Sequence, residues 1–120
     1  MTNKRTLLAA LAAAACLAAP TLASAQAAIT DDVNCVAVAL KLAGDSNPDI
    51  AQAGTLSAFY FAGRVEGRDP RADVMELAAM ALARMSPTEI QANAARCGKQ
   101  LEAKGAEWTA KSKDLEARGY

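Results

Sequence analysis

Ser86-Pro87-Thr88-Glu89-Ile90 is the stretch that decides the fold, because it holds the signals of a helix start in the right order. Serine is a preferred N-cap, proline is favoured at the first helical position, and a glutamate three residues after the serine can complete a capping box. A capping residue followed by proline recurs at Asn47-Pro48 and at Asp69-Pro70. These stretches predict three helices, over residues 48–66, 70–85 and 87–118.

An earlier helix is predicted over residues 31–43. Gly44 follows it as a C-terminal stop, and apolar residues recur within it at helical spacing: Val33, Val36, Ala37 and Leu40. The valines also permit a strand, but Asp45-Ser46-Asn47 is too polar for a tight hairpin, so the helix is preferred. The pair Asp31-Asp32 is interpreted as the charged start of this helix, in preference to a carboxylate pair for catalysis or metal binding.

The four helices predict an all-α fold, a small four-helix bundle that forms one domain over residues 26–120. The helix over 48–66 has no charge between Asp49 and Arg64, so we expect it to be the central and most buried element. Glycine weakens a helix interior, so a bend or break is expected near Gly105 in the last helix. The tail after Lys104 alternates in charge and is expected to face solvent.

Residues 1–25 have the pattern of a secretory signal peptide. Lys4 and Arg5 precede an apolar run over 7–19, and Ala23-Ser24-Ala25 forms a cleavage site. This run is shorter than the roughly 18–20 residues that cross a bilayer, so no stable membrane span is expected in the mature chain. The protein is therefore predicted to be periplasmic or secreted. The alternative is a lipoprotein, in which Cys16 is lipidated instead of cleavage after Ala25.

Removal of the signal peptide leaves two cysteines, Cys35 and Cys97, in an oxidising compartment. We predict a disulfide between them, with two separate buried thiols as the alternative. Closing a loop of about 60 residues contributes roughly 4 kcal/mol in the chain-entropy description. That is a large share of the stability of so small a domain.

The composition of the mature chain excludes several classes of function. Removal of Lys4 and Arg5 leaves 11 basic and 13 acidic side chains, which gives no basic surplus for binding nucleic acid. The chain has no histidine, so nucleophiles paired with histidine and the usual zinc sites are excluded. We therefore predict no enzyme activity, no cofactor and no metal site, and we expect a protein partner.

Two neighbouring features could bind that partner. Phe59-Tyr60-Phe61 places three rings about 100° apart on a helix, so they cannot share one face. Core packing is preferred for them, and Tyr60 is the best candidate for exposure because its hydroxyl tolerates water. The second feature is the group of arginines that follows, Arg64, Arg68 and Arg71. Clustered arginines can hold an anion or a partner's carboxylates, although local pairing with Glu66, Asp69 and Asp73 is preferred. The candidate partner-binding residues are Tyr60, Arg64, Arg68 and Arg71.

With these features in place, the chain resembles the HdeA/HdeB-type periplasmic acid-stress chaperones, which are small helical proteins with one disulfide. The resemblance lies in Val33-Asn34-Cys35, in the helix start leading to Cys97, and in Gly105-Ala106-Glu107-Trp108 with the charges after it. It implies a possible homodimer that loosens when acid protonates carboxylates such as Asp31, Asp32, Glu102 and Glu107. The apolar face of the second helix would then bind unfolding clients, in a transition well below pH 5.

The segment Phe59–Arg71 has no counterpart in that family. Its aromatic pair and two glycines are instead similar to secreted helical immunity proteins, which neutralise a toxin in the periplasm. This resemblance implies a specific binding module that works in its folded state. Acidification should only weaken such a module, which distinguishes it from the chaperone.

Overall fold

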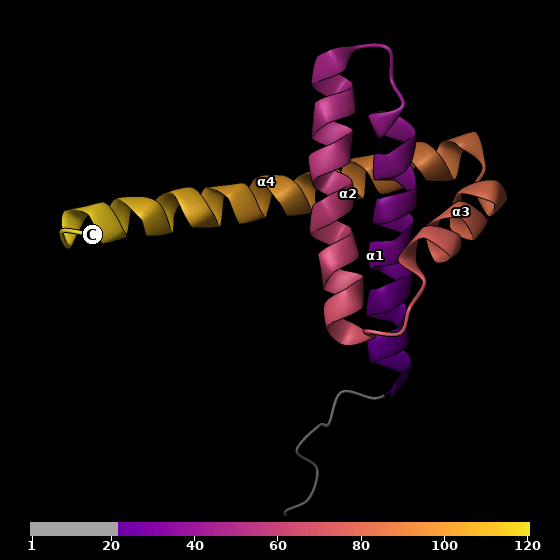
Figure 1. Ribbon diagram of the computed structural model, residues 1–120, viewed down its shortest axis with the longest axis horizontal. Coiled ribbons are helices and arrows are strands. Elements are labelled where there is room, and N and C mark those ends of the chain that lie inside the picture. The colour runs from indigo at the N-terminus through magenta and orange to yellow at the C-terminus, as the bar shows by residue number, and fades with distance from the viewer. Residues whose placement is uncertain (1–21) are drawn as a thin grey trace, which may run out of the picture.

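The computed structural model describes residues 22–120, and this part of the chain consists of four helices without a strand. The helices are α1 (Leu22–Ala43), α2 (Pro48–Arg68), α3 (Val74–Arg84) and α4 (Pro87–Ala117). Figure 1 shows α1 and α2 as an antiparallel pair, α3 beside α1, and α4 crossing the pair and extending beyond it. The predicted all-α helical bundle is confirmed.

The central element is α1, so the prediction that residues 48–66 form the most buried helix was wrong. Helix α1 packs against each of the other three and holds more buried residues than any of them. Helix α2 is buried along one stripe, at Gly54, Ala58, Phe61 and Val65. Its uncharged stretch is rich in small and polar residues that lie at the surface, so the absence of charge did not indicate burial.

Two predicted helix starts were misplaced. Helix α1 already runs from Leu22, so Asp31 and Asp32 lie inside it and do not form its charged start. Helix α3 begins at Val74 rather than at Pro70, and Asp73 is its N-cap, accepting a hydrogen bond from the backbone N–H of Glu76 at 3.0 Å. Asp69 instead ends α2, because its N–H donates to the carbonyl of Val65.

The other two predicted starts are confirmed. The Asn47 side chain accepts from the N–H of Asp49, and Ser86 and Glu89 form a complete capping box. Hydrogen bonds from the backbone and side chain of Ser86 lower the pKa of Glu89, because they favour its ionised form. Helix α4 starting there is continuous through Gly105, so the expected bend or break was wrong.

The predicted disulfide between Cys35 and Cys97 is confirmed, with the two Cα atoms 5.7 Å apart. It joins the middle of α1 to α4 across 62 positions of sequence. Cys97 is also the one buried residue of α4. The attachment of α4 to the rest of the bundle is therefore concentrated around a covalent bond.

Most of the predicted signal peptide, residues 1–21, lies outside the described part of the chain. Its last four residues, 22–25, form the exposed first turn of α1, so cleavage after Ala25 would remove no core residue. Among the helices over residues 22–120, none has the length and apolar character to cross a membrane.

Candidate functional site

The three consecutive rings of α2 point in different directions, as their helical spacing predicts. Phe61 is 0% exposed and fills the core against α1, whereas Phe59 is 74% exposed. Tyr60 is half-buried and packs edge-on against Phe61, with ring centroids 5.0 Å apart. The prediction that Tyr60 is the exposed ring was therefore wrong, because the rotation of α2 that buries Phe61 turns Phe59 to solvent.

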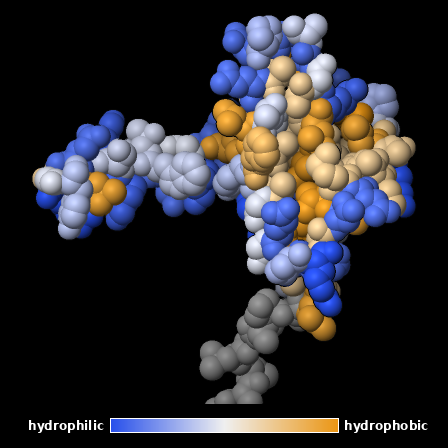
Figure 2. All heavy atoms as spheres, in the orientation of Figure 1, coloured by the Kyte–Doolittle hydropathy of each residue, from blue (hydrophilic) through white to orange (hydrophobic). Residues whose placement is uncertain are grey.

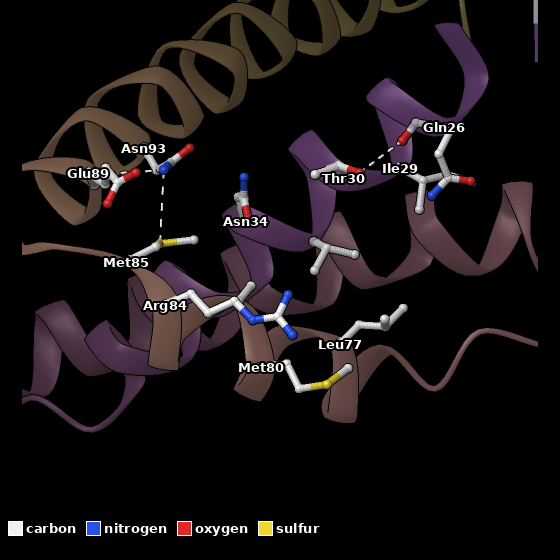
Figure 3. A pocket seen from close by; sticks show the side chains of 12 residues that line it. Gln26, Ile29, Thr30, Asn34, Leu77, Met80, Arg84, Met85, Glu89 and Asn93 are labelled. Atoms are coloured by element: carbon white, nitrogen blue, oxygen red, sulfur yellow. Dashed lines mark hydrogen bonds between the residues drawn. The ribbon is translucent and has the colours of Figure 1, made fainter. Parts of the chain in front are cut away.

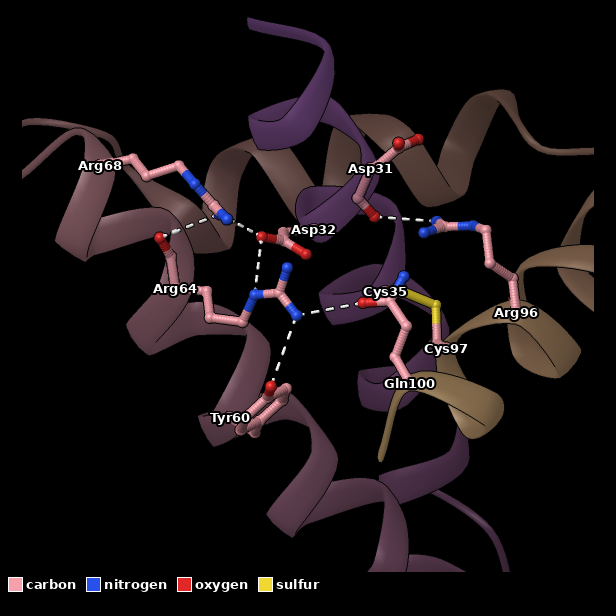
Figure 4. A network of polar contacts seen from close by, with 9 residues as sticks. All are labelled: Asp31, Asp32, Cys35, Tyr60, Arg64, Arg68, Arg96, Cys97 and Gln100. Carbon is pink, nitrogen blue, oxygen red and sulfur yellow. Dashed lines mark hydrogen bonds and ion pairs between the residues drawn. A yellow bond between two sulfur atoms is a disulfide. The ribbon is translucent and has the colours of Figure 1, made fainter. Parts of the chain in front are cut away.

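A buried carboxylate organises the arginines next to these rings (Figure 4). Asp32 is 1% exposed in the middle of α1, and Arg64 and Arg68 of α2 both pair with its Oδ2 atom. Arg64 Nε lies 3.1 Å from that oxygen. One buried negative charge thus faces two guanidinium groups that each remain about one third exposed.

The same network extends to α4. Arg64 donates to the side-chain oxygen of Gln100 at 3.1 Å and lies near the Tyr60 hydroxyl, 3.4 Å away. Its guanidinium also lies over the rings of Tyr60 and Phe61. On the other side of the disulfide, Arg96 donates to the backbone carbonyl of Asp31 at 2.9 Å (Figure 4). The network therefore links α1, α2 and α4 by polar contacts around the Cys35–Cys97 disulfide.

The four predicted partner-binding residues do not form one anion site. Arg64 and Arg68 are paired with Asp32, and Tyr60 packs beneath Arg64. Arg71 lies apart in the α2–α3 turn, 95% exposed, with Asp69 as its carboxylate at 3.9 Å. Local pairing was the preferred interpretation, and for Arg71 it is correct. For the other two arginines the partner is Asp32 of α1, not an interleaved acid.

Asp32→Asn should lower the free energy of unfolding by about 2 kcal/mol, because it removes the one charge that balances two arginines. The value is below that of a fully buried pair, since both guanidinium groups can still reach water. Asp31→Asn is the matched control, because the Asp31 side chain is exposed and only its backbone carbonyl bonds Arg96. Urea unfolding at neutral pH measures both variants. Equal stability of the two would contradict a structural role for the pairing.

An apolar groove lies beside Phe59 on α2. Its volume is about 540 Å³, and it runs between α1, α2 and the start of α3. We call it the Phe59 groove; its lining residues are Val36, Leu40, Ala43, Thr55, Ala58, Phe59, Ala62, Gly63, Glu66, Val74 and Met75. Figure 2 shows hydrophobic atoms gathered over the helical body, in contrast to the mostly hydrophilic extension of α4. Sequence reasoning missed the groove, because three helices contribute to it.

A second hollow of about 380 Å³ lies where α1, α3 and α4 meet (Figure 3). Its walls are more polar and include Gln26, Asn34, Arg84 and Asn93. The side-chain amide of Asn93 donates to the carbonyl of Glu89 and lies 3.9 Å from the Met85 sulfur. Asn93 is thus engaged with its own chain, and the more polar walls make this hollow the weaker candidate for binding an apolar partner surface.

Within residues 22–120, no group of three or more cysteine, aspartate or glutamate side chains is placed to hold a metal ion. Comparison with family models, curated proteins and solved structures finds no match to this chain.

Proposed function

We propose that this protein is exported to the periplasm or the cell exterior and acts without catalysis, by binding another protein in the Phe59 groove. The observation that carries the proposal is the exposure of Phe59 at the edge of an apolar groove. Met75, which also lines the groove, is more than half exposed as well. Large apolar side chains gathered around a groove are typical of interaction sites, whereas single exposed ones are common on any surface.

The groove best fits one apolar face of a partner helix. It is bounded by helices on both sides, and an amphipathic helix laid into such a groove buries side chains at steps of three and four residues. Glu66 contributes a carboxylate to the lining, so a lysine or arginine beside the partner's apolar stripe would be favoured. The walls are held by the close packing of α1 on α2 and by the Asp32 pairs, which lowers the entropy cost of binding.

The second candidate is an acid-activated chaperone, and one observation favours it. Asp32 alone neutralises Arg64 and Arg68, so its protonation would leave two positive charges facing each other at the α1–α2 contact. Loosening of that contact would expose the stripe of α2 that contains Phe61 and Val65. The two candidates differ in which state binds: the folded protein at neutral pH, or a loosened protein in acid.

Replacement of Phe59 by a photo-crosslinking amino acid in the producing cell tests the proposal. We expect a discrete adduct at neutral pH, and Met75→Asp should reduce its yield about tenfold, because it puts a charge into the groove. The same crosslinker at Ala110, exposed on α4, is the matched control position. No adduct at neutral pH, with many adducts in acid, would reject groove binding in favour of the chaperone.

A further inference from the structure

The second half of α4 extends beyond the rest of the described chain (Figure 1). Trp108 on it is 61% exposed, and a Cβ atom added at Gly105 would meet nothing within 4 Å. An isolated helix as short as this part of α4, residues 103–117, is marginal in water unless tertiary contacts cover one of its faces. None of the other described helices supplies such a contact along this part (Figure 1).

One face of α4 passes from a half that packs on α1 and α2 into a half that extends beyond them, where Gly105, Trp108 and Ser112 are exposed and Leu115 is half-buried. In the first half, Ala94, Cys97, Gly98 and Leu101 lie against α1 and α2 around a small cavity. Steps of three and four residues continue this face through Gly105, Trp108, Ser112 and Leu115. The pattern that packs on the body is therefore repeated where the body no longer reaches.

We propose that a second copy of this chain covers the second half of α4, with the two α4 helices antiparallel about a twofold axis. A parallel pair is excluded by the first half of the helix, because that face is already occupied by the chain's own α1 and α2. In the antiparallel arrangement each α4 lies along the uncovered half of the other. The two bodies then lie at opposite ends of the helix pair.

The alternation of small and large residues fits this arrangement. In an antiparallel register centred on residue 110, Gly105 lies opposite Leu115 of the partner subunit and Ser112 opposite Trp108 of the partner subunit. Twofold symmetry repeats both contacts in reverse. Each large side chain thus meets a small one, as close helix packing requires.

The charges beside this face permit the pairing. Residues 103–117 carry three lysines and three acidic side chains, so two copies meet without net repulsion. Several of these charges are already paired within the chain, among them Lys104 with Glu107 and Lys111 with Asp114. The apolar face therefore decides the association. It is separate from the Phe59 groove, so either proposal can fail without the other.

Sedimentation equilibrium of the purified, disulfide-bonded chain over a wide range of concentration tests the association. We expect a reversible monomer–dimer equilibrium, which Leu115→Lys should weaken about tenfold or more by placing a charge in the contact. Ala106→Lys adds the same charge at an exposed position of α4 away from the face of Trp108 and Leu115, and it should leave the equilibrium unchanged. A wild-type chain that stays monomeric throughout, or equal effects of the two lysines, would overturn the proposal.

Cysteine pairs test the register. Gly105→Cys and Leu115→Cys are prepared as separate chains after the native disulfide has formed, and then mixed under mild oxidation. The antiparallel register predicts a mixed disulfide between the two variants in preference to either homodimer. Ser112→Cys homodimers in its place would indicate a parallel pair and overturn the arrangement. Circular dichroism checks that each variant retains its helices.

Discussion

Gly54→Ala is expected to lower the free energy of unfolding by about 3 kcal/mol, although it adds a single methyl group. An added Cβ atom would lie 2.7 Å from the carbonyl carbon of Leu42 and 2.8 Å from the carbonyl oxygen of Ala39. Both are backbone atoms of α1, so no side chain can rotate to make room. The two helices must move apart, which also disturbs the walls of the Phe59 groove. Denaturant unfolding monitored by circular dichroism measures the loss.

Gly63→Ala is the matched control for this change. It lies on the same helix, but an added Cβ atom there meets nothing within 4 Å. Alanine is the better helix former, so this variant should be more stable than the parent by about 0.5–1 kcal/mol. A Gly54→Ala protein that is as stable as Gly63→Ala would mean that α1 and α2 are not in close contact.

Loss of the disulfide is the second large effect, and Cys35→Ser with Cys97→Ser should cost about 4 kcal/mol. The loss of stability should also differ between the helices. Helix α4 has one buried residue, Cys97 itself, whereas α1 and α2 share an apolar contact of many residues. Without the covalent bond, α4 retains the hydrogen bonds of Arg96 and Gln100 and little apolar packing.

Hydrogen exchange measures this uneven loss. We expect α4 to lose most of its protection in the doubly substituted protein, while the facing stripes of α1 and α2 stay protected to a larger extent. The parent protein treated with a reductant is the chemical control for the substitutions. Uniform loss of protection over all four helices would show instead that the disulfide supports the whole bundle equally.

The parts of the fold that the sequence predicts are those governed by local chemistry. Asn47 and Ser86 cap the helices that follow them with their own side chains, so a few residues contain the whole signal. Asp69-Pro70 has the same pattern, but Asp73 is the N-cap of α3 and Asp69 is the C-cap of α2. Both aspartates could cap a helix, and the sequence alone does not show which of them begins α3.

The candidate site was less predictable because its contacts are long-range. Asp32 is 32 and 36 positions away from the arginines that it neutralises, so nothing near it in sequence shows that it is buried with partners. Phe59 and Tyr60 differ in exposure only because of how α2 rotates to bury Phe61. A helical spacing of 100° places the three rings apart, but it does not say which of them faces the core.

The central position of α1 also has a consequence for the order of assembly. Helices α2, α3 and α4 all contact it, and it precedes them in the chain. During synthesis, which starts at the N-terminus, α1 is therefore made first and offers the surface that the other helices share. Each later helix can pack against it once it has been made. Cys97 follows Cys35 by 62 positions, so the disulfide that attaches α4 can form only after the chain has been made as far as α4.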